Sequence, residues 1–193
     1  MPLEPLATLA DLQARNIDAT EPLASTMLAA ASAEVREAAG SPISQTTSTV
    51  ALTGWWHEQY LRLPGPPIVS VDTVAIDGVE VNDWRLDGER LWRADGWGRD
   101  YGPSTVTVTY THGFAEVPAD IVDLVCSLAG AGIAAAQEGY ASHAGVVTER
   151  IDDYSVTYAQ GAEAVATAME LPERTRARLR VRFGGSAGTV VSR

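Results

Sequence analysis

The spacing of hydrophobic positions switches between helical and alternating along the chain. Thr8, with an acidic residue three positions later, has the pattern of a helix cap and predicts a short helix that ends near Asn16. A longer helix is predicted after Thr20, because apolar residues recur every four positions as far as Val35 and Gly40 stands where a helix-ending glycine belongs. Much of its apolar stripe is alanine, which permits close contact with another helix or a neighbouring subunit.

From Gly40 to about Tyr110 the pattern alternates between apolar and polar residues, which is typical of strands. The pair of Asp77 and Gly78 predicts a tight hairpin turn, and a second Asp-Gly pair follows at 87–88. This segment predicts an antiparallel β-meander of about five strands. The expected strands are 46–52, 69–76, 79–86, 91–93 and 105–110.

Helical spacing returns at Pro118, and the helix that begins there is expected to form the centre of the core. Its apolar run from Ile121 to Ala136 is shorter than the roughly 20 residues that cross a bilayer. Gly130 and Gly132 within it cost roughly 1 kcal/mol each relative to alanine. Close packing against another element is therefore expected at both glycines.

The last part of the chain predicts a hairpin-like β segment near 146–158, then a basic helix from Leu171 to about Phe183, then a flexible glycine-rich tail at 184–193. Together the elements predict an α+β fold. Its small helical bundle core comprises 1–44 and 113–183, its inserted antiparallel β-meander comprises 45–112, and its C-terminal end is a basic helix and arm.

Charge is divided unevenly along the chain. The 193 residues include 14 arginines, no lysine and 25 acidic residues, for a formal net charge of −11. Six of the arginines fall between Glu173 and Arg193 with a single acid, whereas the first 172 residues have eight arginines against 24 acids. Such a body repels nucleic acid at long range, while the basic end can dock on an acidic partner. The candidate docking residues are Arg174, Arg176, Arg178, Arg180 and Arg182.

Catalytic chemistry finds little support in the residues. Without lysine, Schiff-base chemistry and lysine-dependent phosphate loops are excluded, and the single Cys126 excludes an intrachain disulfide and a cysteine-based zinc site. No nucleophile-elbow, phosphate-loop or dinucleotide motif is present. The N-terminus lacks the pattern of a secretory signal, so we expect synthesis in a reducing compartment.

Metal sites are equally unsupported. His57, His112 and His143 lack the spacing of a helical metal pair, and a solvated turn explains Asp152 and Asp153 better than metal ligation does. We therefore expect no catalytic residue, no metal, no cofactor and no enzymatic activity. A hydrolase that uses the two aspartates and a histidine stays an alternative.

Aromatic residues offer one possible binding feature. Packing within or between subunits is the favoured interpretation, because strands alternate faces and cross-strand pairs are expected beside the second Asp-Gly turn. Stacking on sugar rings, in a carbohydrate- or ligand-binding module, is the alternative. All five tryptophans fall in the expected β region: Trp55, Trp56, Trp84, Trp92 and Trp97.

Several short segments, spread over residues 8–182, occur in a recognisable order. They are Thr8–Leu12, Ala31–Arg36 followed by Gly40, Leu63–Val71, Val108–Phe114, Val117–Asp120 and Asp153–Tyr158. In this order they resemble the head-tail connector, or head completion adaptor, proteins of long-tailed double-stranded DNA phages. The all-arginine, alanine-rich composition suits high-GC coding, as in an actinobacterial phage.

The resemblance implies a structural virion protein that is not an enzyme. Such proteins form a homo-oligomeric ring, twelvefold in the family, between the portal and the next head-tail protein, a stopper or tail-completion protein. The ring extends the DNA channel of the neck, and double-stranded DNA passes through without sequence-specific binding. The resemblance places the C-terminal segment toward the portal, which gives the arginines a partner. It also implies location at the head-tail junction of the virion, synthesis in the host bacterial cytoplasm and no membrane partner.

Overall fold

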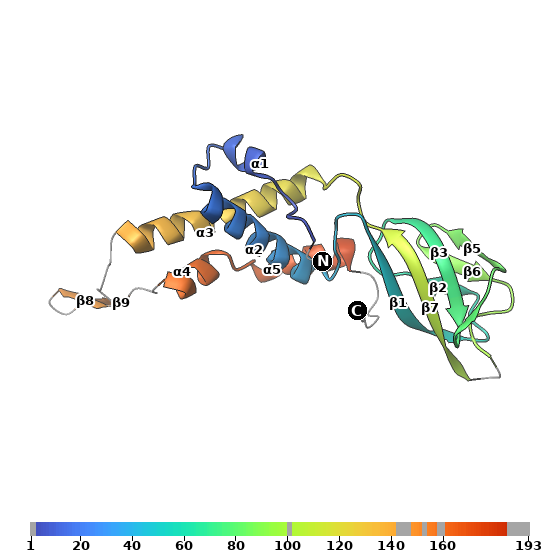
Figure 1. Ribbon diagram of the computed structural model, residues 1–193. Helices are drawn as coiled ribbons and strands as arrows, with labels where there is room; N and C mark the ends of the chain where they lie inside the picture. Colours follow the sequence, from blue (N-terminus) through green and yellow to red (C-terminus); the bar gives the residue numbers. More distant parts are fainter. Residues whose placement is uncertain (1–2, 100–101, 142–147, 152–153, 158–160, 185–193) are drawn as a thin grey trace. The chain divides into compact units, whose positions relative to one another are not determined.

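A computed structural model describes residues 3–99, 102–141, 148–151, 154–157 and 161–184 (Figure 1). The chain is 38% helical and 29% strand, which confirms the α+β class. Its contacts divide it into two compact units. The helical unit comprises Met1–Val35 and Val117–Glu173, and the sheet unit comprises Arg36–Glu116 and Arg174–Arg193. This division groups the last helix with the sheets, whereas the sequence analysis grouped it with the helices.

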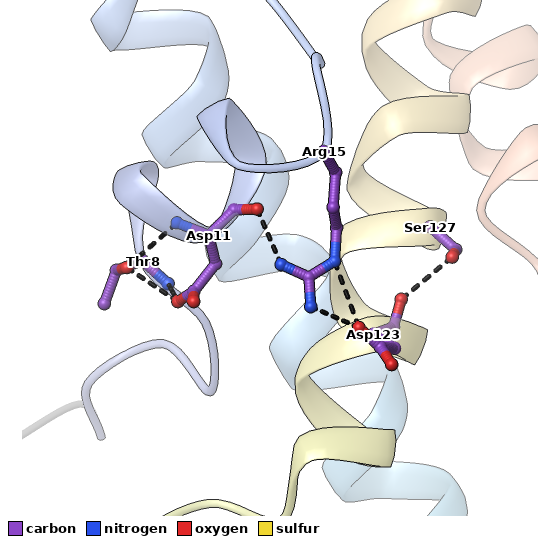
Figure 2. Close-up of polar contacts among 5 residues, drawn as sticks. All are labelled: Thr8, Asp11, Arg15, Asp123 and Ser127. Atoms are coloured by element: carbon purple, nitrogen blue, oxygen red, sulfur yellow. Dashed lines mark hydrogen bonds and ion pairs between the residues drawn. The ribbon is translucent and has the colours of Figure 1, made fainter.

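The first two helices begin after the caps that their sequence indicated, and the second also ends where expected, whereas the first ends at Gln13, three residues before the expected Asn16. Helix α1 is Leu9–Gln13, and Thr8 caps it: the Thr8 hydroxyl accepts from the Asp11 N–H, while the Thr8 N–H donates to the Asp11 carboxylate at 2.7 Å (Figure 2). Helix α2 is Glu21–Ala39. Gly40 ends it with a φ of +64°, a conformation that glycine adopts without strain.

Helix α3, Ala119–Ala141, packs against α4, Gly161–Ala168, which the sequence analysis did not predict. The stripe of α3 that faces its neighbours is fully apolar, and it comprises Ile121, Val125, Cys126, Ala129 and Ile133. The glycines of α3 lie where neighbours approach closely, as expected. A Cβ on Gly132 would lie 2.6 Å from the Met169 Sδ, and one on Gly130 would lie 3.0 Å from the Ile17 Cδ1.

Residues Ala119–Gln137 of α3 are long and apolar enough to cross a membrane by length and composition, because the helix extends beyond the apolar run that the sequence analysis measured. The continuous buried stripe is the arrangement of a core helix. Arg15 joins α1 to α3: its Nε donates to the Asp123 carboxylate at 3.0 Å and its terminal nitrogen to the Asp11 carbonyl at 2.7 Å (Figure 2).

The sheet unit holds two antiparallel sheets rather than the expected meander. The larger sheet has the order β1-β7-β3-β4, so its first strand pairs with its last one along the chain. Strands therefore flank β7 on both edges, so its backbone N–H and C=O groups are paired on both sides. The strands are β1 (Thr46–Trp55), β7 (Pro103–His112), β3 (Ile68–Ile76) and β4 (Val79–Glu80).

The smaller sheet has the order β2-β6-β5 and takes part of a segment that was expected as one strand. Its strands are β2 (Tyr60–Arg62), β6 (Arg90–Arg93) and β5 (Trp84–Asp87). The expected strand 79–86 is therefore divided between two sheets. Both Asp-Gly turns are confirmed: Asp77 and Gly78, at φ +51° and +80°, join β3 to β4, and Gly88, at φ +62°, lies between β5 and β6.

Two further elements lie near the C-terminus. Strands β8 (Thr148–Ile151) and β9 (Tyr154–Thr157) pair as the expected hairpin. Helix α5 is Glu173–Phe183, as predicted to within two residues. Of the tail expected at 184–193, only Gly184 belongs to the described residues.

Candidate functional site

Helix α5 carries all five candidate docking arginines, buries two of its apolar residues and contacts the sheet unit through one of them, Phe183. Leu179 and Phe183 are 5% and 1% exposed, and the Phe183 ring meets Phe114 edge-on with centroids 6.1 Å apart. Between them Val181 is 88% exposed. A helix with two anchoring residues and an uncovered valine has a free side available for a partner.

The five arginines do not form one continuous face. Since residues four apart share a helix side, Arg174, Arg178 and Arg182 form a first, exposed row, in which Arg174 and Arg178 are turned away from the buried anchors and Arg182 lies beside them. The second row, Arg176 and Arg180, lies beside the anchors, and Arg176 is half-buried. The guanidinium of Arg182 lies 4.8 Å from the centroid of the Phe183 ring. The exposed row therefore presents positive charge next to Val181.

Phe114, the anchor for α5, follows β7 and meets the start of the larger sheet. Its N–H donates to the Ile43 carbonyl at 2.8 Å, and its carbonyl accepts from Gln45 at 2.9 Å. Arg36 at the end of α2 supports the same loop, because its Nε donates to the Pro42 carbonyl at 2.9 Å. Burial lowers the pKa of Arg36. The segment that helix α5 contacts is thus held in place by hydrogen bonds.

The five tryptophans have three different environments. Trp97 is fully buried in the core of the sheet unit, and its indole N–H donates to the Gln59 carbonyl at 3.0 Å. Trp84 and Trp92 are half-buried on the smaller sheet. Trp55 and Trp56 are 38% and 46% exposed. The structure does not bring the five rings together into one binding face.

The exposed pair, Trp55 and Trp56, lies on a rigid backbone. The Trp55 carbonyl accepts from the Trp97 N–H at 3.0 Å. A Cβ on Gly96 would collide with the Trp56 carbonyl, and one on Gly98 would lie 2.5 Å from the Trp56 nitrogen. The backbone that carries the two exposed indoles is therefore closely packed, through contacts that only glycine permits.

His112 is a buried structural histidine of the sheet unit. Its Nδ1 lies 2.9 Å from the Gly65 carbonyl, which can only accept, so Nδ1 carries the proton and Nε2 accepts from the Ser48 hydroxyl at 2.9 Å. Its ring stacks on Tyr110 with centroids 4.8 Å apart. Burial lowers the pKa of His112, and the hydrogen bond to Gly65 offsets part of that effect.

Among the described residues there is no cluster of three or more histidine, cysteine, aspartate or glutamate side chains that could hold a metal ion. Asp152, Asp153 and His143, which the hydrolase alternative requires, lie outside the described residues. His57 lies between two exposed indole rings, 5.5 Å from that of Trp56 and 6.1 Å from that of Trp55, centroid to centroid.

The helical unit and the sheet unit, which differ in their contacts, also differ in their net charge. The helical unit has 14 acidic residues and two arginines, a formal charge of −12, whereas the sheet unit has 11 acids and 12 arginines, a formal charge of +1. The sequence analysis located the basic end but missed this division, because the strands of the sheet unit also carry arginines.

Comparison with known proteins adds no relative. Neither the protein-family models nor the curated proteins include a match to this chain.

Proposed function

We propose that this chain is a structural virion protein, a ring adaptor between the portal and the tail of a long-tailed phage. In this role it extends the DNA channel and offers a platform for the next head-tail protein. The observation that carries the proposal is α5, an arginine helix anchored by Leu179 and Phe183 with a free side at Val181. The order of sequence segments that resembles head-tail connectors supports it.

The division of charge also fits this role. DNA that must slide through a channel is not gripped by acidic walls, because binding by counterion release needs cationic side chains. The helical unit, at −12, has the charge that such a wall requires. The exposed row on α5 suits carboxylates of a protein partner, since guanidinium groups bind carboxylates through paired hydrogen bonds.

Binding to purified portal tests the proposal. We expect the double variant Arg174→Glu and Arg178→Glu to lose portal binding by tenfold or more, because two attractive charges become repulsive. The matched control is Arg85→Glu and Arg90→Glu, which makes the same charge change on exposed strand residues of the same unit. Binding is measured at chain concentrations too low for chains to associate with one another. Unchanged portal binding by the α5 variant, or no binding by the wild-type chain, contradicts the proposal.

The exposure of Trp55 and Trp56 favours a second candidate function, a carbohydrate-binding virion module. Two rigid indoles can stack on sugar rings. A glycan ligand would quench their fluorescence and shift their emission, and the double variant Trp55→Ala and Trp56→Ala would abolish the effect. A panel of host cell-wall glycans that leaves the emission unchanged contradicts this candidate.

A further inference from the structure

The smaller sheet has a solvent-facing side on which aromatic and arginine side chains alternate. Tyr60 is paired with Trp92 across β2 and β6, and Arg85 is paired with Trp92 across β5 and β6. Directly paired residues share one face, whereas Leu61 and Leu91 point to the other face and are 6% and 0% exposed. The side chains of this arginine–aromatic face are Tyr60, Arg62, Arg85, Arg90 and Trp92, together with one acid, Asp87, which is paired with Arg90.

Two of the arginines are held flat on aromatic rings. The guanidinium carbon of Arg85 lies 4.3 Å from the centroid of Trp92, and that of Arg90 lies 4.8 Å from the centroid of Tyr60. Arg62 forms an ion pair with Glu89 at 3.6 Å, but within the described ranges neither Arg85 nor Arg90 has an ion pair. Stacking orders a guanidinium and leaves its edge N–H groups available to a carboxylate.

Tyrosine, tryptophan and arginine are the residues that dominate the binding energy of protein interfaces. Arg85, Arg90 and Tyr60 are all exposed, Tyr60 at 44%. The composition and the geometry of the face therefore indicate a protein partner that offers carboxylates.

The helical unit contains a hollow of matching character. It lies between α1 and the start of α2, and its volume is about 160 Å³. Polar and apolar residues both line it, and its two acids, Asp18 and Glu21, are exposed. Its apolar lining includes Leu9, Leu12, Ile17 and Ala24.

We propose that the arginine–aromatic face of one chain docks on the hollow between α1 and α2 of a second copy, with Arg85 and Arg90 facing its Asp18 and Glu21. Charge favours this occupant, because the face, with three arginines and one aspartate, meets the helical unit, whose formal charge is −12. Two different surfaces make the contact heterologous, and a heterologous contact closes into a ring when its rotation allows. This inference rests on the proposed ring adaptor and assigns the surfaces that join its subunits.

Charge exchange in the full chain tests the contact. Sedimentation velocity follows association of the free chain, and particle counts by electron microscopy follow association of chains on the portal. We expect the sheet variant, Arg85→Glu and Arg90→Glu, and the hollow variant, Asp18→Arg and Glu21→Arg, each to weaken association by tenfold or more. Combining all four substitutions should restore it, because each attraction is exchanged rather than lost. Circular dichroism confirms that each variant is folded.

The α5 variant, Arg174→Glu and Arg178→Glu, is the matched control for sedimentation velocity and should leave association of the free chain unchanged, because its residues belong to neither surface. Wild-type association should also weaken as salt rises, since surface charges are screened beyond about 10 Å at 0.1 M salt. If the chains associate in this way but do not bind portal, the contact stands and the proposed function fails.

Three results overturn the proposed contact. The first is that chains bind the portal but do not associate with one another, either in free solution or on the portal. The second is that the variant with all four substitutions is folded but does not regain association. The third is binding of a DNA oligonucleotide by the arginine–aromatic face while association is unaffected by the sheet variant.

Discussion

Phe183 meets Phe114 edge to face, with an interplanar angle of 84° between the rings. Phe183 is the last residue of α5, and Phe114 follows β7, so one aromatic contact ties the arginine helix to the sheet unit. The charge that the proposed function requires is therefore presented by a helix whose position depends on a small apolar anchor.

Replacing Phe183 with alanine should release α5. The loss of a buried ring costs about 3–5 kcal/mol, and here it removes the contact between α5 and Phe114. We expect faster amide exchange throughout α5 and a lower free energy of unfolding in urea. The control, Val181→Ala, changes a side chain that is 88% exposed and should stay within about 0.5 kcal/mol of the wild type. Equal exchange rates in Phe183→Ala and wild type would contradict this anchoring role.

The stability of the sheet unit should fall in mild acid because of His112. Burial places its folded pKa below the unfolded value of 6.5, so the unfolded chain takes up the proton first as the pH falls. The free energy of unfolding should be constant above about pH 6.5 and decline below it, by at most about 1.4 kcal/mol per pH unit. Urea unfolding between pH 7.5 and pH 5.5 measures the slope.

The comparison for this prediction is His112→Gln against His57→Gln. The first variant should abolish most of the slope, although it also lowers stability at neutral pH. The second variant replaces an exposed histidine by the same residue and serves as the matched control. A wild-type slope that survives in His112→Gln assigns the titration to another group.

Gly54→Ala should destabilise the corner that holds the exposed tryptophans. A Cβ at this position collides with the Trp97 carbonyl and lies 2.6 Å from the Trp97 Cβ and 2.7 Å from the Val106 Cγ2. Backbone atoms cannot rotate away, so overpacking should cost about 1–3 kcal/mol. Thermal unfolding measures the loss, and Thr53→Ala, on the exposed neighbour, should be nearly neutral. A Gly54→Ala protein as stable as wild type would show that β1 and Trp97 can separate at no cost.

Thr8→Ala should loosen α1 by removing its cap. The Thr8 hydroxyl satisfies an N–H of the first turn, and its loss costs about 1 kcal/mol (Figure 2). The Asp11 carboxylate should respond as well, because its hydrogen bond with Thr8 is the main cause of its lowered pKa. Carboxyl resonances followed by NMR should give Asp11 a higher pKa in Thr8→Ala. Thr8→Ser keeps the hydroxyl and should preserve both properties, and an unchanged Asp11 titration in Thr8→Ala would exclude this cap as the cause.

Local signals in the sequence predicted the ends of elements well. Thr8, Gly40 and Asp77 act within one turn of chain, so their effect does not depend on distant residues. The sequence did not predict helix α4, because its eight residues, Gly161–Ala168, follow no capping pattern. Its stability comes instead from packing against α3.

The candidate docking residues were predicted in part. The arginine spacing located α5, but the separation into an exposed row and a row beside the anchors follows from which side Leu179 and Phe183 bury. The sequence did not predict the arginine–aromatic face, because Tyr60 and Arg90 are 30 residues apart and meet only through strand pairing.

The sequence by itself determined the α+β class, the helix caps, the turns and the basic C-terminal helix, because each depends on a few neighbouring residues. The tertiary structure alone decided that β1 pairs with β7, that Trp97 is buried while Trp56 is exposed, and that a +1 unit separates from a −12 unit. The physical reason is that burial and charge are summed over residues brought together by folding, and the order of residues along the chain does not specify those partners.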